Sequence, residues 1–138
     1  MEKEGSERGN LIFVDSSYFI AFADKADRWH KDAVKLSENI KTGVVVSDYV
    51  IAEAVSTIGH RGGGKAGADL CDFLVNNFQV IYVDEELLKQ SMEVYLRYDG
   101  TLSVADAVSV EVMRRRGIKK IISFDADFDK VTSISRVH

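Results

Sequence analysis

The sequence predicts a single α/β domain with a mainly parallel sheet, because two kinds of segment alternate along it. Five short runs rich in Val, Ile and Phe recur along the 138 residues, and segments with helical periodicity separate them. With 46% hydrophobic residues, a chain of this length can bury one core. We therefore expect one domain over residues 11–138, preceded by a flexible extension over the charged residues 1–10.

The expected strands are short and apolar, and a helix follows most of them. The strands are predicted at residues 11–14, 44–46, 80–83, 120–123 and 134–137. The helices are predicted at residues 17–23, 27–41, 49–59, 66–77, 85–98 and 104–116. This order of strand and helix favours parallel pairing with helical crossovers.

Capping and turn residues agree with this division of the chain. Asp27 and Ser103 can cap helix starts. The residues just past predicted helix ends include Gly43, Gly100 and Gly117. Because the chain has no proline, glycine makes most turns, and the glycine-dense residues 60–67 are expected to connect two helices flexibly.

Composition and charge limit the class of protein. Acidic residues outnumber basic ones by 22 to 18, and a net charge of -4 argues against a protein that coats nucleic acid through bulk electrostatics. The single cysteine, Cys71, excludes an intramolecular disulfide. No apolar stretch follows the first ten residues that could form a signal peptide or a membrane span. We expect a soluble cytoplasmic protein with no membrane partner.

An acidic net charge is still compatible with a nuclease, which needs only a local basic surface for the substrate backbone. The alternative interpretation of a basic run at a helix end is a solvated complement to the helix dipole. The candidates for a basic surface are Arg114, Arg115, Arg116, Lys119 and Lys120, with Arg61 and Lys65 elsewhere.

Acidic residues gather where the chain leaves the predicted strands. Asp15 and Asp48 follow the first two strands, and Asp125 lies two residues past Ser123. Glu53 and Asp106 lie near the starts of helices that begin at the same edge. Ligands of open α/β sheets bind outside the carboxyl ends of the strands, so we expect these acids to converge there.

Converging carboxylates indicate a hard divalent cation, Mg²⁺ or Mn²⁺, which prefers oxygen ligands. Such a cation lowers the pKa of a bound water and neutralises charge on a phosphoryl group during hydrolysis. Without a cation, the carboxylates would repel one another and raise their own pKa values.

Each acid also has a purely structural interpretation. Asp15 could cap the helix that follows it, and Asp125 could cap a short turn. Asp106 lies three residues after Ser103, as in a capping box. Glu53 stands in an apolar stretch, where exposure on one helix face is the ordinary explanation. The ordered recurrence of the four acids at one sheet edge favours a functional site.

Four motifs around these acids resemble the PIN-domain family, whose best-known members are the ribonuclease toxins of VapBC toxin and antitoxin pairs. The motifs cover residues 12–17, 47–53, 102–107 and 122–128, and the resemblance extends from about residue 11 to 137. It implies a three-layer α/β/α fold with a five-stranded parallel sheet of order 3-2-1-4-5.

The resemblance also implies a Mg²⁺- or Mn²⁺-dependent endoribonuclease that hydrolyses RNA phosphodiester bonds. The implied metal-binding and catalytic residues are Asp15, Glu53, Asp106 and Asp125, with Ser123 as a supporting hydroxyl. Ser17 replaces an asparagine found in many members, and Asp127 adds a fifth acid whose role the motifs do not define. The implied partners are RNA, an antitoxin protein, and a second copy bound through the helices at about 49–77.

Three other functions compete with this interpretation. The first is a catalytically inert PIN fold that acts as an RNA- or protein-binding scaffold. The second is a phosphatase with Asp15 as nucleophile, although such enzymes usually need a second Asp where this chain has Ser17. The third is a receiver-like signalling module, whose acid pair and late lysine fit the spacing poorly.

Two further patterns are interpreted as structural. Residues 59–65 match the start of a P-loop, but Ala66 replaces the required hydroxyl and the stretch follows a helix. His30 and His60 have no second His or Cys at ligand spacing. We expect His30 to be partly exposed and Trp29 to pack a helix against the sheet.

Overall fold

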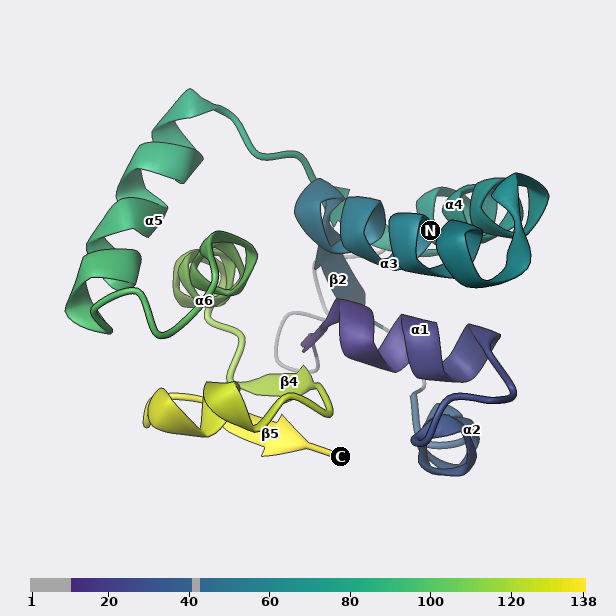
Figure 1. Cartoon of the computed structure of the whole chain (residues 1–138). Coiled ribbons are helices and arrows are strands. Elements are labelled where there is room, and N and C mark those ends of the chain that lie inside the picture. Colours follow the sequence, from purple (N-terminus) through teal and green to yellow (C-terminus); the bar gives the residue numbers. More distant parts are fainter. Residues whose placement is uncertain (1–10, 41–42) are drawn as a thin grey trace.

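All five strands of the computed structural model pair in parallel in one sheet of order β3-β2-β1-β4-β5, which confirms the predicted order (Figure 1). The structure describes residues 11–40 and 43–138, so the predicted extension over 1–10 lies outside the described residues. The strands are β1 (Ile12–Val14), β2 (Val44–Ser47), β3 (Gln79–Ile81), β4 (Lys120–Ile122) and β5 (Ser135–Val137).

Helices cover both faces of this sheet, as predicted for an α/β domain. Figure 1 shows α3 and α4 packed together on one side of the molecule and α5 and α6 on the other. The helices are α1 (Ser16–Ala23), α2 (His30–Ser37), α3 (Asp48–Gly62), α4 (Gly64–Asn77), α5 (Glu85–Arg97) and α6 (Val104–Arg116), with a short 3-10 helix, η2 (Ala126–Lys130).

The central strands are buried because helices cover both of their faces. All four residues of β2 are buried, and Phe13, Val14 and Ile121 in the neighbouring strands are almost inaccessible. Strands covered on both faces have continuous apolar runs instead of an alternating pattern. The apolar runs in the sequence therefore predicted strands that lie inside the core.

The acids next to two strands make structural contacts. The backbone N–H of Asp15 donates to the carbonyl of Ile122 at 3.0 Å, which extends the β1–β4 pairing by one residue. At the next strand, Asp48 Oδ1 accepts a 3.0 Å hydrogen bond from the N–H of Val83. Asp48 thus holds the segment after β3 and has a structural role at the sheet edge.

The predicted flexible connection over residues 60–67 is wrong. Helix α3 continues through Gly62 and α4 begins at Gly64, so Gly63 alone separates them. Gly63 has a φ of 99°, a conformation that residues with a Cβ rarely adopt. The remaining glycines of this stretch lie within helices because α3 and α4 pack closely against each other.

Helix α2 is shorter than the predicted range of 27–41. Asp27 does not cap it; Asp27 Oδ1 accepts the N–H of Trp29 at 2.9 Å in the turn before the helix, and Trp29 is the N-cap residue. At the other end of the predicted range, residues 41 and 42 lie outside the described residues. Other predicted caps are confirmed: Ser103 caps α6, and Gly117 ends it in a left-handed conformation.

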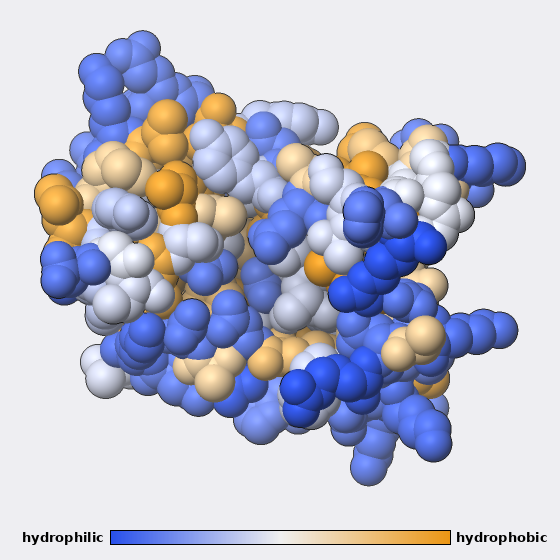
Figure 2. Space-filling view, in the orientation of Figure 1, coloured by the Kyte–Doolittle hydropathy of each residue, from blue (hydrophilic) through white to orange (hydrophobic). Residues whose placement is uncertain are grey.

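The surface combines charged side chains with a few exposed apolar ones. Figure 2 shows hydrophobic side chains gathered over the α5 and α6 side of the molecule. Leu96 of α5 and Val104 of α6 are among the exposed large apolar residues, at 75% and 39%. Within residues 11–40 and 43–138, no helix combines the length and apolarity needed to cross a membrane.

Gly67 permits the close approach of α4 to α3, and replacing it tests this packing. A Cβ at Gly67 would lie 2.9 Å from the carbonyl oxygen of Val55 and 3.2 Å from the Cα of Gly59. We expect Gly67→Ala to lower the free energy of unfolding by about 1–3 kcal/mol, as overpacking does elsewhere. The matched control is Gly59→Ala, whose Cβ would meet nothing within 4 Å and should stabilise α3 slightly. Equal unfolding free energies for both variants in urea denaturation would contradict the packing argument.

Candidate active site

Asp15 is the centre of the site, where the chain passes from β1 into α1. Its side chain is buried, with 5% exposed, and its Oδ2 accepts three hydrogen bonds. Two come from hydroxyls, Ser17 Oγ at 2.8 Å and Ser123 Oγ at 2.8 Å. The third comes from the backbone N–H of Ser17 at 3.4 Å, which makes Asp15 the N-cap of α1.

The two hydroxyls stabilise the ionised form of Asp15. Ser17 Oγ and Ser123 Oγ lie 3.3 Å apart. Each hydroxyl has one proton, and each can donate it to Oδ2 of Asp15. Burial is the largest influence on Asp15 and raises its pKa. The hydroxyl hydrogen bonds oppose this increase, whereas the charge of Glu53 adds to it, and the pKa remains raised overall.

Ser123 also connects Asp15 to Asp125. Ser123 Oγ accepts the N–H of Asp125 at 3.0 Å, and Asp125 Oδ1 accepts the N–H of Asp127 at 2.9 Å. Asp125 is thereby the N-cap of η2, as the structural interpretation expected. The fifth acid, Asp127, forms an ion pair with Lys130 at 3.2 Å. Its side chain thus contacts a lysine on the same short helix.

Asp106 lies in the first turn of α6, with the N–H of Asp106 donating to Ser103 Oγ at 3.0 Å. Its pKa is raised to about 7. Partial burial is the largest cause, the negative charges of Asp15 and Asp125 follow, and that of Glu53 contributes as well. The hydroxyl of Ser103 acts in the opposite direction. The charge of Asp106 is therefore coupled to all three other predicted acids.

Glu53 reaches the same region from α3. Its side chain is exposed on a helix whose neighbouring face packs Val50, Ile51 and Ala54 into the core. Its charge raises the pKa of both Asp15 and Asp106. Helix-face exposure thus explains how an acid fits into an apolar stretch, and the charge of Glu53 acts on Asp15 and Asp106.

The acids interact electrostatically, but their side chains are not arranged as a metal-coordination site. Among residues 11–40 and 43–138, no three His, Cys, Asp or Glu side chains are arranged as ligands of one metal ion. The donor set itself is suitable for a hard cation, because it consists of carboxylate oxygens. Asp15 Oδ2 is occupied by three donors, and no hydrogen bond reaches Oδ1 from the described residues.

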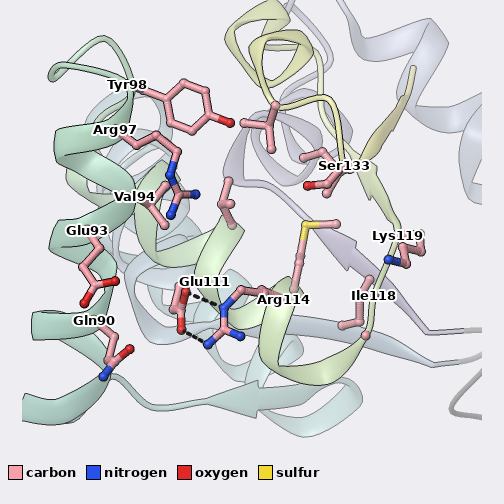
Figure 3. A pocket seen from close by; sticks show the side chains of 15 residues that line it. Gln90, Glu93, Val94, Arg97, Tyr98, Glu111, Arg114, Ile118, Lys119 and Ser133 are labelled. Carbon is pink, nitrogen blue, oxygen red and sulfur yellow. Dashed lines mark hydrogen bonds and ion pairs between the residues drawn. The ribbon is translucent and has the colours of Figure 1, made fainter.

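A separate cavity of about 210 Å³ lies between α5, α6 and the segment before β5 (Figure 3). None of the five predicted site residues lines it. Its wall includes Glu111, a buried carboxylate that accepts hydrogen bonds from Arg114 at 2.8 and 3.1 Å and from Arg115 at 3.2 Å. These two arginines neutralise Glu111, and it holds the pKa of Arg114 above its usual value.

The predicted basic surface at residues 114–120 lies away from the acids. Arg116 ends α6, about 15 Å along the helix from Asp106 at the usual rise per residue. Lys120 begins β4, whereas Ser123 follows its carboxyl end, so the two lie at opposite edges of the sheet. Arg61 and Lys65 are also engaged, in ion pairs with Asp24, Asp27 and Asp69.

Comparison with known proteins identifies the family of this domain. The sequence model of the PIN domain matches residues 12–134. The chain is 31% identical over 120 residues to the 23S rRNA-specific endonuclease VapC20 of Mycobacterium tuberculosis, covering 86% of this chain and 92% of that protein. The chain belongs to the PIN-domain family.

Solved structures of PIN-domain proteins have the same fold. The crystal structure of M. tuberculosis VapC20, described as a Sarcin-Ricin loop cleaving toxin, superposes with a TM-score of 0.80 at 30% identity, covering 86% of this chain and 93% of the other. A toxin-antitoxin complex from Klebsiella pneumoniae superposes with a TM-score of 0.67 at 14% identity, covering 91% and 95%. At that identity the second similarity concerns the fold alone.

Within this PIN domain, sequence reasoning missed part of the support for Asp15. Ser17 was noted as a replacement for asparagine and for the second Asp of a phosphatase, yet its hydroxyl donates to Asp15 and accepts the N–H of Phe124 at 2.9 Å. Arg136 of β5 donates to the carbonyl of Ser123 at 3.2 Å and pairs with Asp129. Its distance in sequence from the motifs left no signal for this contact.

The raised pKa of Asp106 gives a prediction for stability without divalent cations. Its pKa is about 7 in the folded state and near 3.8 when unperturbed. Between these values the folded protein holds a proton that the unfolded chain has released, so the free energy of unfolding falls as pH rises. In Asp106→Asn, we expect the free energy of unfolding to fall by roughly 1–2 kcal/mol less over this pH range than in the wild type, after allowance for solvent screening.

This difference is measured by urea denaturation in EDTA from pH 4 to 8. The control is Asp69→Asn, an exposed carboxylate in an ion pair with Lys65, which should follow the wild-type curve. Parallel pH profiles for wild type and Asp106→Asn would mean that the charge cluster does not act on Asp106 in solution.

Proposed function

We propose that this PIN-domain protein is a Mg²⁺- or Mn²⁺-dependent endoribonuclease, with Asp15, Glu53, Asp106 and Asp125 as the residues that hold the metal. The observation that carries the proposal is the coupling of Asp106 to Asp15, Asp125 and Glu53, whose charges help raise its pKa to about 7. Like charges held together in this way are stabilised by a cation. The similarity to an rRNA endonuclease over most of the chain supports RNA as the substrate.

The protein residues have distinct parts in this proposal. Ser17 and Ser123 hold one oxygen of Asp15 and leave Oδ1 for a cation. A bound Mg²⁺ or Mn²⁺ would supply an activated water and neutralise charge on the phosphoryl oxygens. Asp106 must be ionised to bind a cation, so metal affinity should increase as pH rises through about 7. Ser123 is a positioning residue, since it acts on the substrate only through Asp15 and Asp125.

The phosphatase alternative requires Asp15 to attack a phosphoryl group. Three donors hold one of its oxygens, and Ser17 occupies the place of the acid that such enzymes usually provide. The inert scaffold remains the competing function, and an activity measurement distinguishes it from a nuclease.

The proposal is tested by cleavage of labelled RNA in Mg²⁺, Mn²⁺ and EDTA. Because the related VapC20 is described as cleaving the Sarcin-Ricin loop, the substrates are an oligonucleotide of that hairpin and a pool of single-stranded RNA. We expect metal-dependent cleavage, and a decrease of about 10³-fold or more in Asp15→Asn and in Asp106→Asn, since both remove metal ligands.

The matched control for these variants is Asp69→Asn, which removes an exposed carboxylate on α4 and should cleave like wild type. Cleavage in EDTA, or full activity of both active-site variants, would overturn the metal-dependent mechanism. A wild-type protein that binds RNA but cuts neither substrate in any metal would favour the scaffold.

We also propose that the protein pairs with an antitoxin and forms a homodimer through α3 and α4. Support for an antitoxin comes from the solved toxin-antitoxin complexes that share this fold.

For the dimer, α4 exposes Phe73 at 48% and Val75 at 41%, two large apolar side chains on the helices predicted for the interface. We expect light scattering at tens of micromolar to give twice the monomer mass, and Phe73→Ser to give the monomer. A wild-type monomer at this concentration would contradict the dimer.

A further inference from the structure

A cation and two aromatic rings form a stack beside the acid cluster. The rings of Trp29 and Phe124 lie parallel, with an interplanar angle of 3° and centroids 5.2 Å apart. The guanidinium carbon of Arg28 lies 4.6 Å from the centroid of the Trp29 ring. Arg28 is exposed, whereas both rings are half-buried. The contact with the Trp29 ring therefore restrains the Arg28 side chain and keeps its positive charge at the surface.

Phe124 connects this stack to the active site. It lies in sequence between Ser123 and Asp125, and its N–H donates to Ser17 Oγ at 2.9 Å. Ser17 in turn donates to Asp15. The ring on which Trp29 stacks thus belongs to the loop that carries Asp125 and the Ser123 hydroxyl bound to Asp15.

The loop between α1 and α2, which carries Arg28 and Trp29, is held by several polar contacts. Asp27 accepts the N–H of Trp29 with Oδ1 and the guanidinium of Arg61 with Oδ2, at 2.9 and 3.0 Å. Arg61 also binds Asp24 at 2.8 Å, and the ring Nδ1 of His30 lies 2.8 Å from the carbonyl oxygen of Ala21. An ordered loop loses less entropy when it binds a ligand.

Basic residues continue from this loop along α2. Lys31 and Lys35 lie four residues apart and therefore share one face of the helix, and both are exposed. Within residues 11–40 and 43–138, no carboxylate forms an ion pair with Arg28, Lys31 or Lys35. By contrast, ion pairs engage Arg61, Arg114, Arg115 and Arg136.

We propose that Arg28, held over Trp29, together with Lys31 and Lys35, forms the track that binds the RNA backbone next to the cleaved phosphodiester. This inference rests on the proposed ribonuclease function and names the surface that the substrate uses. A cluster of carboxylates repels a polyanion, so phosphates that flank the reacting one need a cationic surface nearby. Arg28 suits this role because its planar guanidinium can donate to phosphate oxygens while its face remains on the indole.

The stack contains its own reporter, because Trp29 is the only tryptophan of the chain. RNA binding is measured by fluorescence anisotropy of labelled RNA and by Trp29 emission. The parent protein is the full chain with Asp15→Asn, which prevents cleavage. We expect RNA to change Trp29 emission, and Arg28→Gln to weaken binding roughly ten- to a hundredfold, as loss of a charged hydrogen bond does. Arg28→Lys should restore part of the affinity, since it keeps the charge but loses the planar fork.

The salt dependence measures the whole track. With Arg28, Lys31 and Lys35 all replaced by Gln, the slope of log affinity against log salt should become shallower by about 2, at roughly 0.7 per phosphate contact. The matched control is Arg116→Gln, which removes the same charge at the distant end of α6 and should leave affinity, emission change and slope as in the parent. Circular dichroism confirms that the exposed substitutions keep the fold.

The outcomes separate this inference from the proposed function. Suppose that the protein with its native Asp15 cuts RNA, but that Arg28→Gln gives the same affinity and the same change in Trp29 emission as the Asp15→Asn parent. The proposed track would then be wrong, while the proposed ribonuclease function would be supported. An equal loss in Arg116→Gln would also overturn the track, because the effect would then be general electrostatics. If the wild-type protein neither binds nor cuts RNA, both proposals fail together.

Discussion

The site depends on one buried carboxylate oxygen, Oδ2 of Asp15. Burial of a charged group is costly unless hydrogen bonds compensate it, and here donors come from the start of α1 and from the end of β4. Ser17 and Ser123 lie 106 residues apart in sequence, so all three donors meet at Asp15 only when β1 and β4 are paired. The sheet assembly that buries Asp15 and raises its pKa therefore also supplies the Ser123 hydroxyl that opposes this rise.

The structural and functional interpretations of the acids are compatible. Asp15 caps α1, Asp125 caps η2, and the N–H of Asp106 binds the Ser103 cap of α6. A carboxylate near a helix start is favoured by the helix dipole and by free backbone N–H groups. Local folding thus places three acids at one sheet edge, and the fold tolerates their mutual repulsion because each is held by contacts that a lone surface acid would lack.

Much of this arrangement could be predicted from the sequence, because it depends on local patterns. Apolar runs gave the strands, and acids directly after strands must meet at the carboxyl edge of a parallel sheet. Residues 60–67 were mispredicted because glycine content suggests a loop, whereas the close packing of α3 on α4 favours Gly67 within a helix. The stack of Trp29 on Phe124 joins residues far apart in sequence, and no periodicity reveals such a contact. The same limit applies to Arg136 of β5, which donates to the carbonyl of Ser123 just after β4.

Charge distribution explains how a protein with a net charge of -4 can accept a polyanion. The most obvious basic run, at the end of α6, is partly neutralised by Glu111 and lies at the opposite edge of the sheet from Ser123. The sequence suggested this run as the basic surface for the substrate because its charges are contiguous. The position of a charge relative to the sheet, however, determines whether it can act on the site. Screening in salt limits the influence of an exposed charge to about 10 Å, so a cation acts on substrate at the acids only if it lies on the same side. Arg28 meets this condition through its stack on Trp29 and Phe124, since Phe124 stands directly between Ser123 and Asp125.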